Sequence, residues 1–365
     1  MRVALLDLPS YTPPYDHSLA AALARRGHDV TLLTSRFPYG EAPRPEGYVR
    51  EELFFPVSGR LRRVAPRSRV HRLLKAAEYY PSVQLLRRRL EALDADVVHV
   101  QWLALPRQDL RWLQPMRSTV FTAHDLLGRR RAAREVWVAV CNAVDRVVVH
   151  SLRGIAELAE GGVARERIAL IPHPVFESSV HEPSPPNGKT LLFFGLLRAY
   201  KGLDLLVRAL ASVPEGRLVI AGDPLDPVEP VQQLAREVGV ADRIDWRLGF
   251  VPDDEVSTLL RSATAVVLPY RRADSSGVLA TALGYGRPAI VSDVGGLGET
   301  VREFGAGLVV PPDDVEALAR ACRRLLTDPD ELASAFRGTQ AARRALSWDA
   351  AAERHEQLYE QVRRQ

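Results

Sequence analysis

The sequence predicts an α/β protein built from two doubly wound parallel-sheet domains. Short apolar runs alternate with helical patterns along the chain, which is typical of parallel strands covered by helices on both faces. The alternation occurs in each half of the chain, and the length of 365 residues also favours two domains. Between the halves, His181–Gly188 carries three prolines and has no periodicity, so we predict a linker there.

The alternation sets the expected elements and boundaries. We expect a first domain at residues 1–180, a linker at 181–188, a second domain at 189–346, and a C-terminal helix at 347–365 that packs back on the first domain. Open parallel sheets bind ligands at the carboxyl ends of their strands, so two such domains would face each other across a cleft. The runs expected to be strands are Val3–Leu8, Val30–Thr34, Val97–Val100, Val120–Thr122, Val147–His150, Ile168–Ile171, Leu191–Phe194, Leu218–Ala221, Ile244–Arg247, Ala265–Leu268, Ala289–Ser292 and Leu308–Val310.

Composition favours an ordinary globular protein. Hydrophobic residues make up 46% of the chain and charged residues 26%. No apolar run approaches the roughly 18–20 residues that cross a bilayer, and Met1–Pro9 is too short an apolar segment for a signal peptide. Cys141 and Cys322 lie far apart and lack metal-ligand spacing. A cytoplasmic protein is therefore expected.

Basic residues cluster at Arg60–Lys75, Arg87–Arg89 and Arg129–Arg131. Two interpretations stay open for them: a solvated surface in an arginine-rich chain, or contact with anionic lipid or a charged acceptor. The second would place the protein at the inner face of the membrane, through Arg60–Lys75. No basic-aromatic interleaving and no finger or helix-turn-helix pattern accompanies the clusters, so nucleic acid is not an expected partner.

The segment Leu191–Gly202 carries the most chemical information. A continuous apolar run ends in a tight turn at Gly195, and a helical pattern begins after Gly202. Two cations, Arg198 and Lys201, lie within this strand-to-helix turn, and Lys201 is one of only three lysines in the chain. An arginine fork and a lysine point charge together suit a diphosphate.

The chain resembles the family 4 retaining glycosyltransferases, which have the GT-B fold of two Rossmann-like domains facing across a cleft. The resemblance covers nearly the whole chain and is weakest at residues 35–95, where such enzymes meet their acceptors. It implies an N-terminal acceptor-binding domain and a C-terminal nucleotide-sugar-binding domain. The fragments that carry it, in order, are Phe121–Asp125, Val149–Ser151, Ile171–Pro174, Phe193–Gly202, Ala221–Asp223, Gly249–Glu255, Leu268–Tyr270, Ser276–Leu279, Gly284–Pro288 and Gly295–Glu299.

The resemblance implies roles for particular residues. Arg198 and Lys201 would contact the donor diphosphate and stabilise the departing nucleotide, and His124 would contact the transferred sugar. The usual arginine directly after the glycine is replaced here by Leu196, and Arg198 follows two positions later, as in a subgroup of the family. The turn formed by Gly249, Phe250 and Val251 would form a wall of the base pocket.

The sequence departs from the family at two glutamates that usually lie eight positions apart. Their positions fall at Ala273 and Thr281, so neither carboxylate is present. Asp274 is one residue from the first position and could substitute for it. Thr281 could make one hydrogen bond to the ribose but cannot replace a bidentate carboxylate.

The loop that precedes this second position still suits a phosphate. Ser275 or Ser276 can cap the helix that follows, and Gly277 lets a phosphate or a sugar approach the backbone closely. The free amides of a helix N-terminus favour an anion. For Glu299, contact with the donor sugar or ribose and a simple first-turn helix acid are both open.

These expectations combine into one reaction, the transfer of a hexosyl group from a UDP- or GDP-linked sugar to a hydroxyl acceptor with retained configuration. The acceptor could be a lipid-linked sugar, a polysaccharide end or a small natural product. No Asp-x-Asp is present, and the pairs Asp253–Asp254 and Asp313–Asp314 are better explained as helix caps. We therefore expect no metal and no cofactor.

Two alternatives remain open. A sugar-nucleotide 2-epimerase of the same architecture would also cleave at the anomeric phosphate, but it needs carboxylates placed for proton abstraction. A degenerate copy that binds a sugar nucleotide without turnover would explain the missing glutamates.

Overall fold

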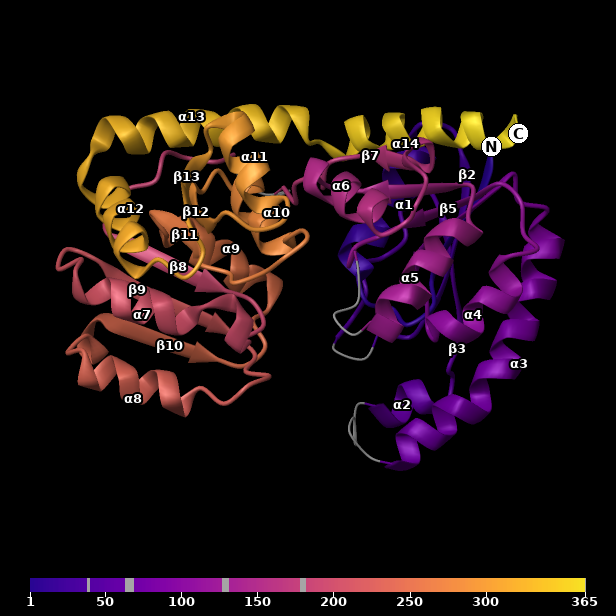
Figure 1. Cartoon of the computed structure of the whole chain (residues 1–365), viewed down its shortest axis with the longest axis horizontal. Coiled ribbons are helices and arrows are strands. Elements are labelled where there is room, and N and C mark those ends of the chain that lie inside the picture. The colour runs from indigo at the N-terminus through magenta and orange to yellow at the C-terminus, as the bar shows by residue number, and fades with distance from the viewer. Residues whose placement is uncertain (38–39, 63–68, 127–130, 178–181, 365) are drawn as a thin grey trace. The chain divides into compact units, whose positions relative to one another are not determined.

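The computed structural model describes residues 1–37, 40–62, 69–126, 131–177 and 182–364 (Figure 1). Arg129 and Arg130, His181 and the side chains of residues 61–72 lie outside the description. The chain divides into two compact units. The first comprises Met1–His150, Gly154–Pro172 and Trp348–Gln365, and the second comprises Ser151–Arg153 and His173–Ser347. The chain thus enters the second unit at His173, ahead of the segment that we expected to be the linker.

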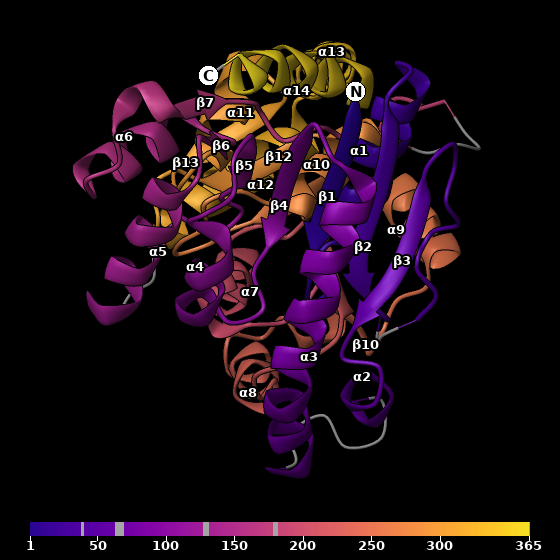
Figure 2. The same cartoon turned by 90° about the vertical axis from the view of Figure 1, so that its right-hand side faces the viewer.

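The first unit contains a seven-stranded sheet in the order β3-β2-β1-β4-β5-β6-β7, and its strand pairs are parallel (Figure 2). The order reverses between β1 and β4, which makes their carboxyl ends the topological switch point. The strands are β1 (Arg2–Asp7), β2 (Asp29–Ser35), β3 (Val49–Phe54), β4 (Val97–Trp102), β5 (Thr119–Thr122), β6 (Arg146–Val149) and β7 (Ile168–Leu170).

Helix α14 (Trp348–Arg363), at the end of the chain, packs on α1 (Pro13–Arg25) of the first unit. The Arg25 guanidinium lies 2.8 Å from the Asp349 carboxylate across this contact. The buried face of α14 includes Leu358 and Tyr359. The other helices of this unit are α2 (Ser58–Arg62), α3 (Arg69–Leu93), α4 (Pro106–Leu113), α5 (Arg131–Ala143), η1 (Arg165–Arg167) and α6 (Leu152–Glu160), whose first two residues count with the second unit.

The second unit contains a six-stranded parallel sheet in the order β10-β9-β8-β11-β12-β13. Its strands are β8 (Thr190–Phe194), β9 (Arg217–Gly222), β10 (Ile244–Leu248), β11 (Ala265–Leu268), β12 (Ala289–Ser292) and β13 (Gly307–Val310). Its helices are η2 (Ala199–Lys201), α7 (Leu203–Ala211), α8 (Glu229–Glu237), η3 (Ala241–Arg243), α9 (Asp253–Ser262), α10 (Gly277–Gly284), α11 (Leu297–Phe304), α12 (Val315–Thr327) and α13 (Pro329–Ala345).

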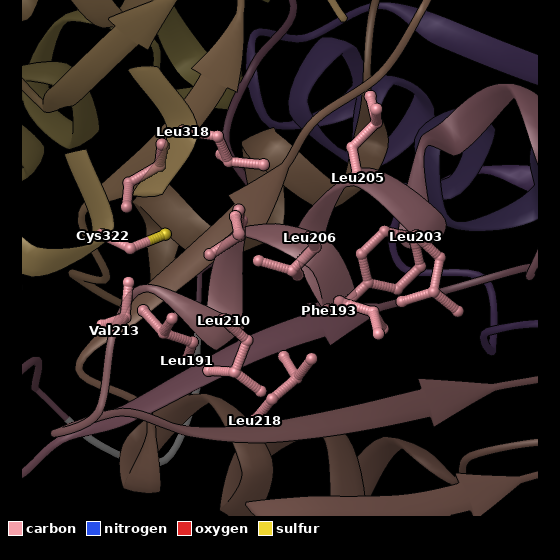
Figure 3. Packing of buried hydrophobic residues seen from close by; sticks show 14 of the residues in the cluster. Leu191, Phe193, Leu203, Leu205, Leu206, Leu210, Val213, Leu218, Leu318 and Cys322 are labelled. Atoms are coloured by element: carbon pink, nitrogen blue, oxygen red, sulfur yellow. The ribbon is translucent and has the colours of Figure 1, made fainter. Parts of the chain in front are cut away.

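Helices α7 and α12 cover one face of the second sheet and form its core with β8 (Figure 3). Leu206 and Leu210 of α7 pack with Phe193 of β8, and all three are almost fully buried. Each such side chain contributes roughly 1.5–3 kcal/mol by its removal from water. Cys322 lies in this core, and burial raises the pKa of its thiol to about 12, so it is an unreactive packing residue.

The predicted fold class, two doubly wound parallel sheets, is confirmed, and each run expected to be a strand overlaps a strand of the structure. Strand β3 was not expected. Its sequence, Val-Arg-Glu-Glu-Leu-Phe, is polar because it forms the edge of the sheet and is only half-buried. Within the described ranges no helix combines the length and the apolar character that crossing a membrane requires.

Candidate active site

Three glycines shape the turn between β8 and α7. Gly195 has a φ of +100°, and its amide donates to the Ala221 carbonyl at 2.9 Å. A side chain at Gly222 would overlap the Gly195 carbonyl, and one at Gly202 would overlap the Pro269 carbonyl. The backbones of β8, β9 and the loop after β11 therefore meet more closely than other residues would allow. This close packing places Lys201 at the carboxyl end of β8.

Lys201 is buried, with 7% of its surface exposed. Its Nζ lies 5.3 Å from the centroid of the Tyr270 ring, a cation–π contact. Burial and the nearby Arg198 charge lower the pKa of the Lys201 ammonium to about 8. In the described part of the chain no carboxylate forms an ion pair with this ammonium. A buried cation whose charged neighbour is another cation suits an anionic ligand.

Arg198 itself is exposed, at the start of the η2 turn. Its carbonyl accepts from the Lys201 amide at 2.9 Å. The next amide, of Ala199, donates to the Asp226 carboxylate at 2.8 Å, which fixes the loop to the segment after β9. The structure thus places Arg198 at the surface and Lys201 beneath it, close enough for the two charges to interact.

The N-terminus of α10 lies against the same turn. A side chain at Gly195 would begin 3.0 Å from Val278 Cγ2 and 3.4 Å from Lys201 Nζ. Ser276 caps the helix, because its Oγ accepts from the Leu279 amide at 3.2 Å. The first amides of the helix and its positive dipole end therefore neighbour the Lys201 ammonium. The helix starts at Gly277, where no neighbouring atom lies closer than 4.0 Å to an added Cβ.

The residues at the expected glutamate positions have local roles. The Thr281 hydroxyl donates to the Gly277 carbonyl at 2.7 Å within α10, so only its lone pairs are left for a ligand. Asp274 and Ser275 are half-buried, and the Asp274 carbonyl accepts from the Gly296 amide at 2.9 Å. Ala273 has no polar side chain. Ala273 and Thr281 thus lack the family's carboxylates, and Asp274 holds the one carboxylate next to these positions.

Glu299 has a role that its sequence context did not suggest. Its two carboxylate oxygens accept from the amides of Leu152 and Arg153, both at 2.8 Å. These residues begin α6 and belong to the same compact unit as Glu299. In this structure the Glu299 carboxylate caps a helix, a role that satisfies amides that would otherwise lack a partner.

The turn expected to flank the base lies next to the turn between β8 and α7. The Gly249 amide donates to the Gly222 carbonyl at 3.0 Å, and Gly249 has a φ of +125°. Phe250 is 68% exposed, whereas Val251 packs partly into the core. An exposed ring beside a glycine turn offers a flat surface on which a base can stack.

A cluster of ion pairs around Arg271 holds the turn between β8 and α7 in place, and local sequence patterns do not reveal this cluster. The Arg271 guanidinium binds both carboxylate oxygens of Asp204, at 2.9 and 2.8 Å, and one oxygen of Asp313 at 2.7 Å. It also donates to the Ala199 carbonyl at 3.1 Å, and the Arg271 amide donates to the Tyr200 carbonyl. Arg271 therefore joins the loop after β11 to the first two residues of η2 and to the start of α7.

His124 belongs to the first unit, where it follows β5. It is 9% exposed, and its Nε2 lies 2.9 Å from Gln101 Oε1. Its ring stacks on Trp102, with centroids 5.1 Å apart and planes 12° apart, and Tyr15 meets it edge-on at 4.8 Å. Gln101, Trp102 and Tyr15 thus contact the imidazole from three sides.

A polar pocket in the first unit lies beside the start of α1. Asp16, within it, is fully buried, and burial together with the neighbouring Asp7 holds the pKa of its carboxyl well above the ordinary value. Asp7 accepts from the amides of Tyr11 and Thr12, at 2.7 and 3.1 Å. The pocket is lined by Ser10, Pro13, Asp16, Leu32, Thr34, Ser35, Ala42, Tyr48, Arg50 and Glu52. Its hydroxyls and charged groups suit a polyhydroxylated ligand.

No group of three or more His, Cys, Asp or Glu residues has a metal-binding arrangement among the residues that the structure describes.

Two parallel α/β sheets, each with its ligand-binding edge at the strand carboxyl ends, define a protein of the GT-B class. Residues 188–328 match the family model described as Glycosyl transferases group 1, and residues 15–177 match that of Glycosyltransferase Family 4. The two matches together span most of the chain, which belongs to the family 4, group 1 glycosyltransferases.

Curated relatives include several D-inositol 3-phosphate glycosyltransferases. The one from Acidothermus cellulolyticus is 32% identical over 236 residues, which cover 58% of this chain and 52% of that protein. The one from Nocardia farcinica is 27% identical and covers 86% of this chain and 76% of that protein. The chain therefore spans about half the length of the first of these relatives.

Solved structures share the fold over the whole chain. Sucrose-phosphate synthase from Thermosynechococcus elongatus superposes with a TM-score of 0.76 at 22% identity and covers 99% of each chain. Anabaena HepE in complex with UDP and glucose has a TM-score of 0.75 at 17% identity and covers 99% of this chain and 100% of its own. These likenesses show the GT-B fold.

Proposed function

We propose that this chain transfers a hexosyl group from a UDP- or GDP-linked sugar to a hydroxyl acceptor, with retained anomeric configuration and without a metal. The observation that carries the proposal is the buried Lys201 beside Gly195 and the N-terminus of α10. Two observations support the donor class. The curated relatives are named as glycosyltransferases, and HepE was solved in complex with UDP-glucose.

The leaving group of such a reaction is a nucleotide diphosphate, whose negative charge grows as the glycosidic bond breaks. Lys201, Arg198 and the first amides of α10 provide fixed positive charge for it. Preorganised charge of this kind stabilises the transition state more than the substrate. Because the protein itself supplies this positive charge, a divalent cation is not needed to neutralise the leaving diphosphate.

Retention has two possible routes. Double inversion needs a carboxylate nucleophile beside the anomeric carbon. The positions where the family carries glutamates hold Ala273 and Thr281 in this chain. We therefore favour transfer on one face of the sugar, in which a departing phosphate oxygen accepts the acceptor's proton.

We place the acceptor in the first unit, in the pocket beside α1. Ser10, Thr34 and Tyr48 offer hydroxyls there, and Arg50 offers a positive charge. This combination suits a polyol or sugar that carries an anionic group. The relatives' acceptor, D-inositol 3-phosphate, has this chemistry, and it is the first acceptor to test.

The test compares Lys201→Ala with Lys189→Ala. Lys189 is an exposed lysine of the same unit, so it controls for loss of charge. We expect Lys201→Ala to fold but to lose on the order of 10²–10³ in kcat, as for removal of one transition-state donor. Lys189→Ala should keep its activity. Normal turnover by Lys201→Ala would reject the proposed site, and strict dependence on Mg²⁺ or Mn²⁺ after chelation would reject metal independence.

A non-catalytic sugar-nucleotide-binding protein is the second candidate, and the missing glutamates favour it. Thermal shift by UDP in a protein that shows no transfer to any acceptor would support this candidate. An epimerase would convert the donor sugar in the absence of an acceptor, which analysis of the recovered sugar nucleotide detects.

We also propose that the segment Arg60–Lys75 contacts anionic lipid peripherally. Its described ends combine an exposed Arg60, a 71% exposed Leu73 and, nearby, a 55% exposed Val57. Apolar side chains among basic ones favour a charged membrane surface. Sedimentation with phosphatidylserine vesicles should capture the protein at low salt, and equal binding to neutral vesicles would contradict this proposal.

A further inference from the structure

Strand β4 carries two polar side chains on a buried face of the first sheet. His99 and Gln101 are both 0% exposed, and because they lie two residues apart they share one face of the strand. The alternate residues, Val98 and Val100, pack into the hydrophobic core. Polar groups buried in this way are costly unless they are hydrogen-bonded.

Their hydrogen bonds form one chain from α14 to His124. The Tyr359 hydroxyl lies 2.6 Å from His99 Nδ1, and His99 Nε2 lies 3.1 Å from Gln101 Nε2. Gln101 Oε1 lies 2.9 Å from His124 Nε2. Thr122 adds its hydroxyl, 2.7 Å from His99 Nε2. All of these residues belong to the first unit.

The amide of Gln101 fixes the proton position on His124. An amide nitrogen only donates and an amide oxygen only accepts. With its oxygen toward His124, the amide requires a hydrogen on His124 Nε2. Its nitrogen lies 3.1 Å from His99 Nε2 and 3.4 Å from His99 Nδ1, so it rests against the His99 ring and does not point at one lone pair. The two ring nitrogens of His99 are instead met by hydroxyls, Thr122 at Nε2 and Tyr359 at Nδ1, which hold the ring that supports Gln101.

The same region also fixes the orientation of the His124 ring. Trp102 stacks on one face of it and Tyr15 meets it edge-on. Tyr15 in turn packs edge-on against Trp348, the first residue of α14, with centroids 5.0 Å apart. Burial lowers the pKa of His99 well below its ordinary value, which keeps this ring neutral. Helix α14 thus supports His124 both through Trp348 and through Tyr359.

We propose that Gln101 and His99 are positioning residues that hold His124 as the neutral Nε2–H tautomer, with Tyr359 of α14 anchoring the far end of the chain. The hydrogen-bonded sequence Tyr359–His99–Gln101–His124 carries this inference. It rests on the proposed function only through the contact with the transferred sugar that the family resemblance implies for His124. A ring held in this way keeps one orientation and one proton position, on Nε2.

The first experiment measures the tautomers directly and does not depend on activity. Nitrogen-15 NMR of the histidine side chains should show His124 with its hydrogen on Nε2 in the unaltered protein. Gln101→Leu should give a mixture of tautomers at His124, whereas Gln101→Glu, which keeps an acceptor oxygen, should preserve the hydrogen on Nε2. Gln108→Leu, at an exposed glutamine on α4, should change nothing. Unchanged His124 signals in Gln101→Leu would overturn the proposal.

A second variant covers the case in which Gln101→Leu does not fold. Tyr359→Phe removes one oxygen and keeps the ring in its buried position. His99 Nδ1 then loses its hydrogen-bond partner, so the His99 Nδ1 signal should move. An unaltered His99 Nδ1 signal in this variant would overturn the anchoring role of Tyr359.

Kinetics separate this inference from the proposed function. Gln101→Leu should lower kcat by about tenfold or more, the effect of one buried hydrogen bond, and Gln101→Glu should recover part of the loss. The shift of Tm by UDP should not change, because Lys201 is unaltered. Absence of transfer in the unaltered protein would reject the proposed function, while the NMR result would still decide the role of Gln101. Full activity of Gln101→Leu alongside an active unaltered protein would reject the positioning role.

Discussion

Lys201 is the residue whose protonation should decide how strongly the second unit holds a diphosphate. Its pKa is lowered to about 8, so the ammonium is charged at pH 7 and loses its proton as the pH rises through this value. We expect the affinity for UDP to fall above pH 8, by about tenfold per pH unit once the free lysine is neutral. Binding at pH 8.5 should take up a proton, which calorimetry in buffers of different ionisation enthalpy measures.

Two variants control for other groups that titrate in this range. Lys201→Arg keeps its charge throughout, so its weaker binding should no longer depend on pH. Lys189→Ala should show the same profile as the unaltered protein. A dissociation constant for UDP that stays flat from pH 7 to 9.5 would show that Lys201 does not contact the diphosphate.

At the residue scale, the sequence reveals groups of residues that are close along the chain and misses contacts between residues that are far apart along it. Gly195 and Lys201 were predicted together because a strand, a turn and a helix start follow one another within twelve residues. The cap that Glu299 provides could not be predicted, because its partner Leu152 is 147 residues away. The Arg271–Asp204 pair spans 67 residues and has no local signal either. Chemistry that depends on tertiary contacts needs the structure.

At the element scale, α10 should couple stability to ligand binding through its cap. Ser276→Ala removes the oxygen that accepts from Leu279 and should lower the free energy of unfolding by about 1 kcal/mol. Because the freed amides lose their preset orientation beside Lys201, the variant should also bind UDP several-fold more weakly. Asp328→Ala, which removes the cap of α13, should cost similar stability and leave UDP affinity unchanged. Equal effects of both variants on UDP binding would exclude α10 from the site.

Elements were predicted where burial dictates the sequence. Strands covered on both faces must be apolar, as in β1, β8 and β11, and their runs are visible without a structure. Strand β3 was missed because an edge strand keeps polar residues such as Glu51, which pairs with Arg89 of α3. Its polarity resembles that of a loop, and only its pairing with β2 identifies it as a strand.

At the scale of the whole molecule, the composition of a segment was a poorer guide to its role than apolar runs were to the strands. The proline-rich run at 181–188 was expected to be a linker, and its described residues, 182–188, group with the second unit. The buried Arg287 donates to the Ser184 carbonyl at 2.6 Å, and Pro183 packs so closely on Gly286 that a side chain there would collide. Prolines limit hydrogen bonding but do not prevent a segment from packing on a domain.

The two units should respond to different solution conditions. His150 and His355 of the first unit are buried, and burial lowers the pKa of each to about 4. The unfolded chain binds these protons near pH 6.5, so between about pH 6.5 and 4 it holds more protons than the folded unit, and stability falls as the pH falls. The loss is on the order of 3 kcal/mol for each imidazole by pH 4.

Ligand binding should act on the other unit. UDP at 100 times its dissociation constant stabilises the folded site by about 2.7 kcal/mol, and the residues proposed to hold it lie in the second unit. Hydrogen exchange read by peptide separates these effects. Lowering the pH from 7 to 5, with exchange rates corrected for pH, should reduce protection of β4, β6 and α14, whereas UDP should increase protection of η2, α7 and α10. Acid effects of equal size in both units, or UDP protection confined to the first, would contradict this division, because the buried histidines and the buried lysine would then not act where the structure places them.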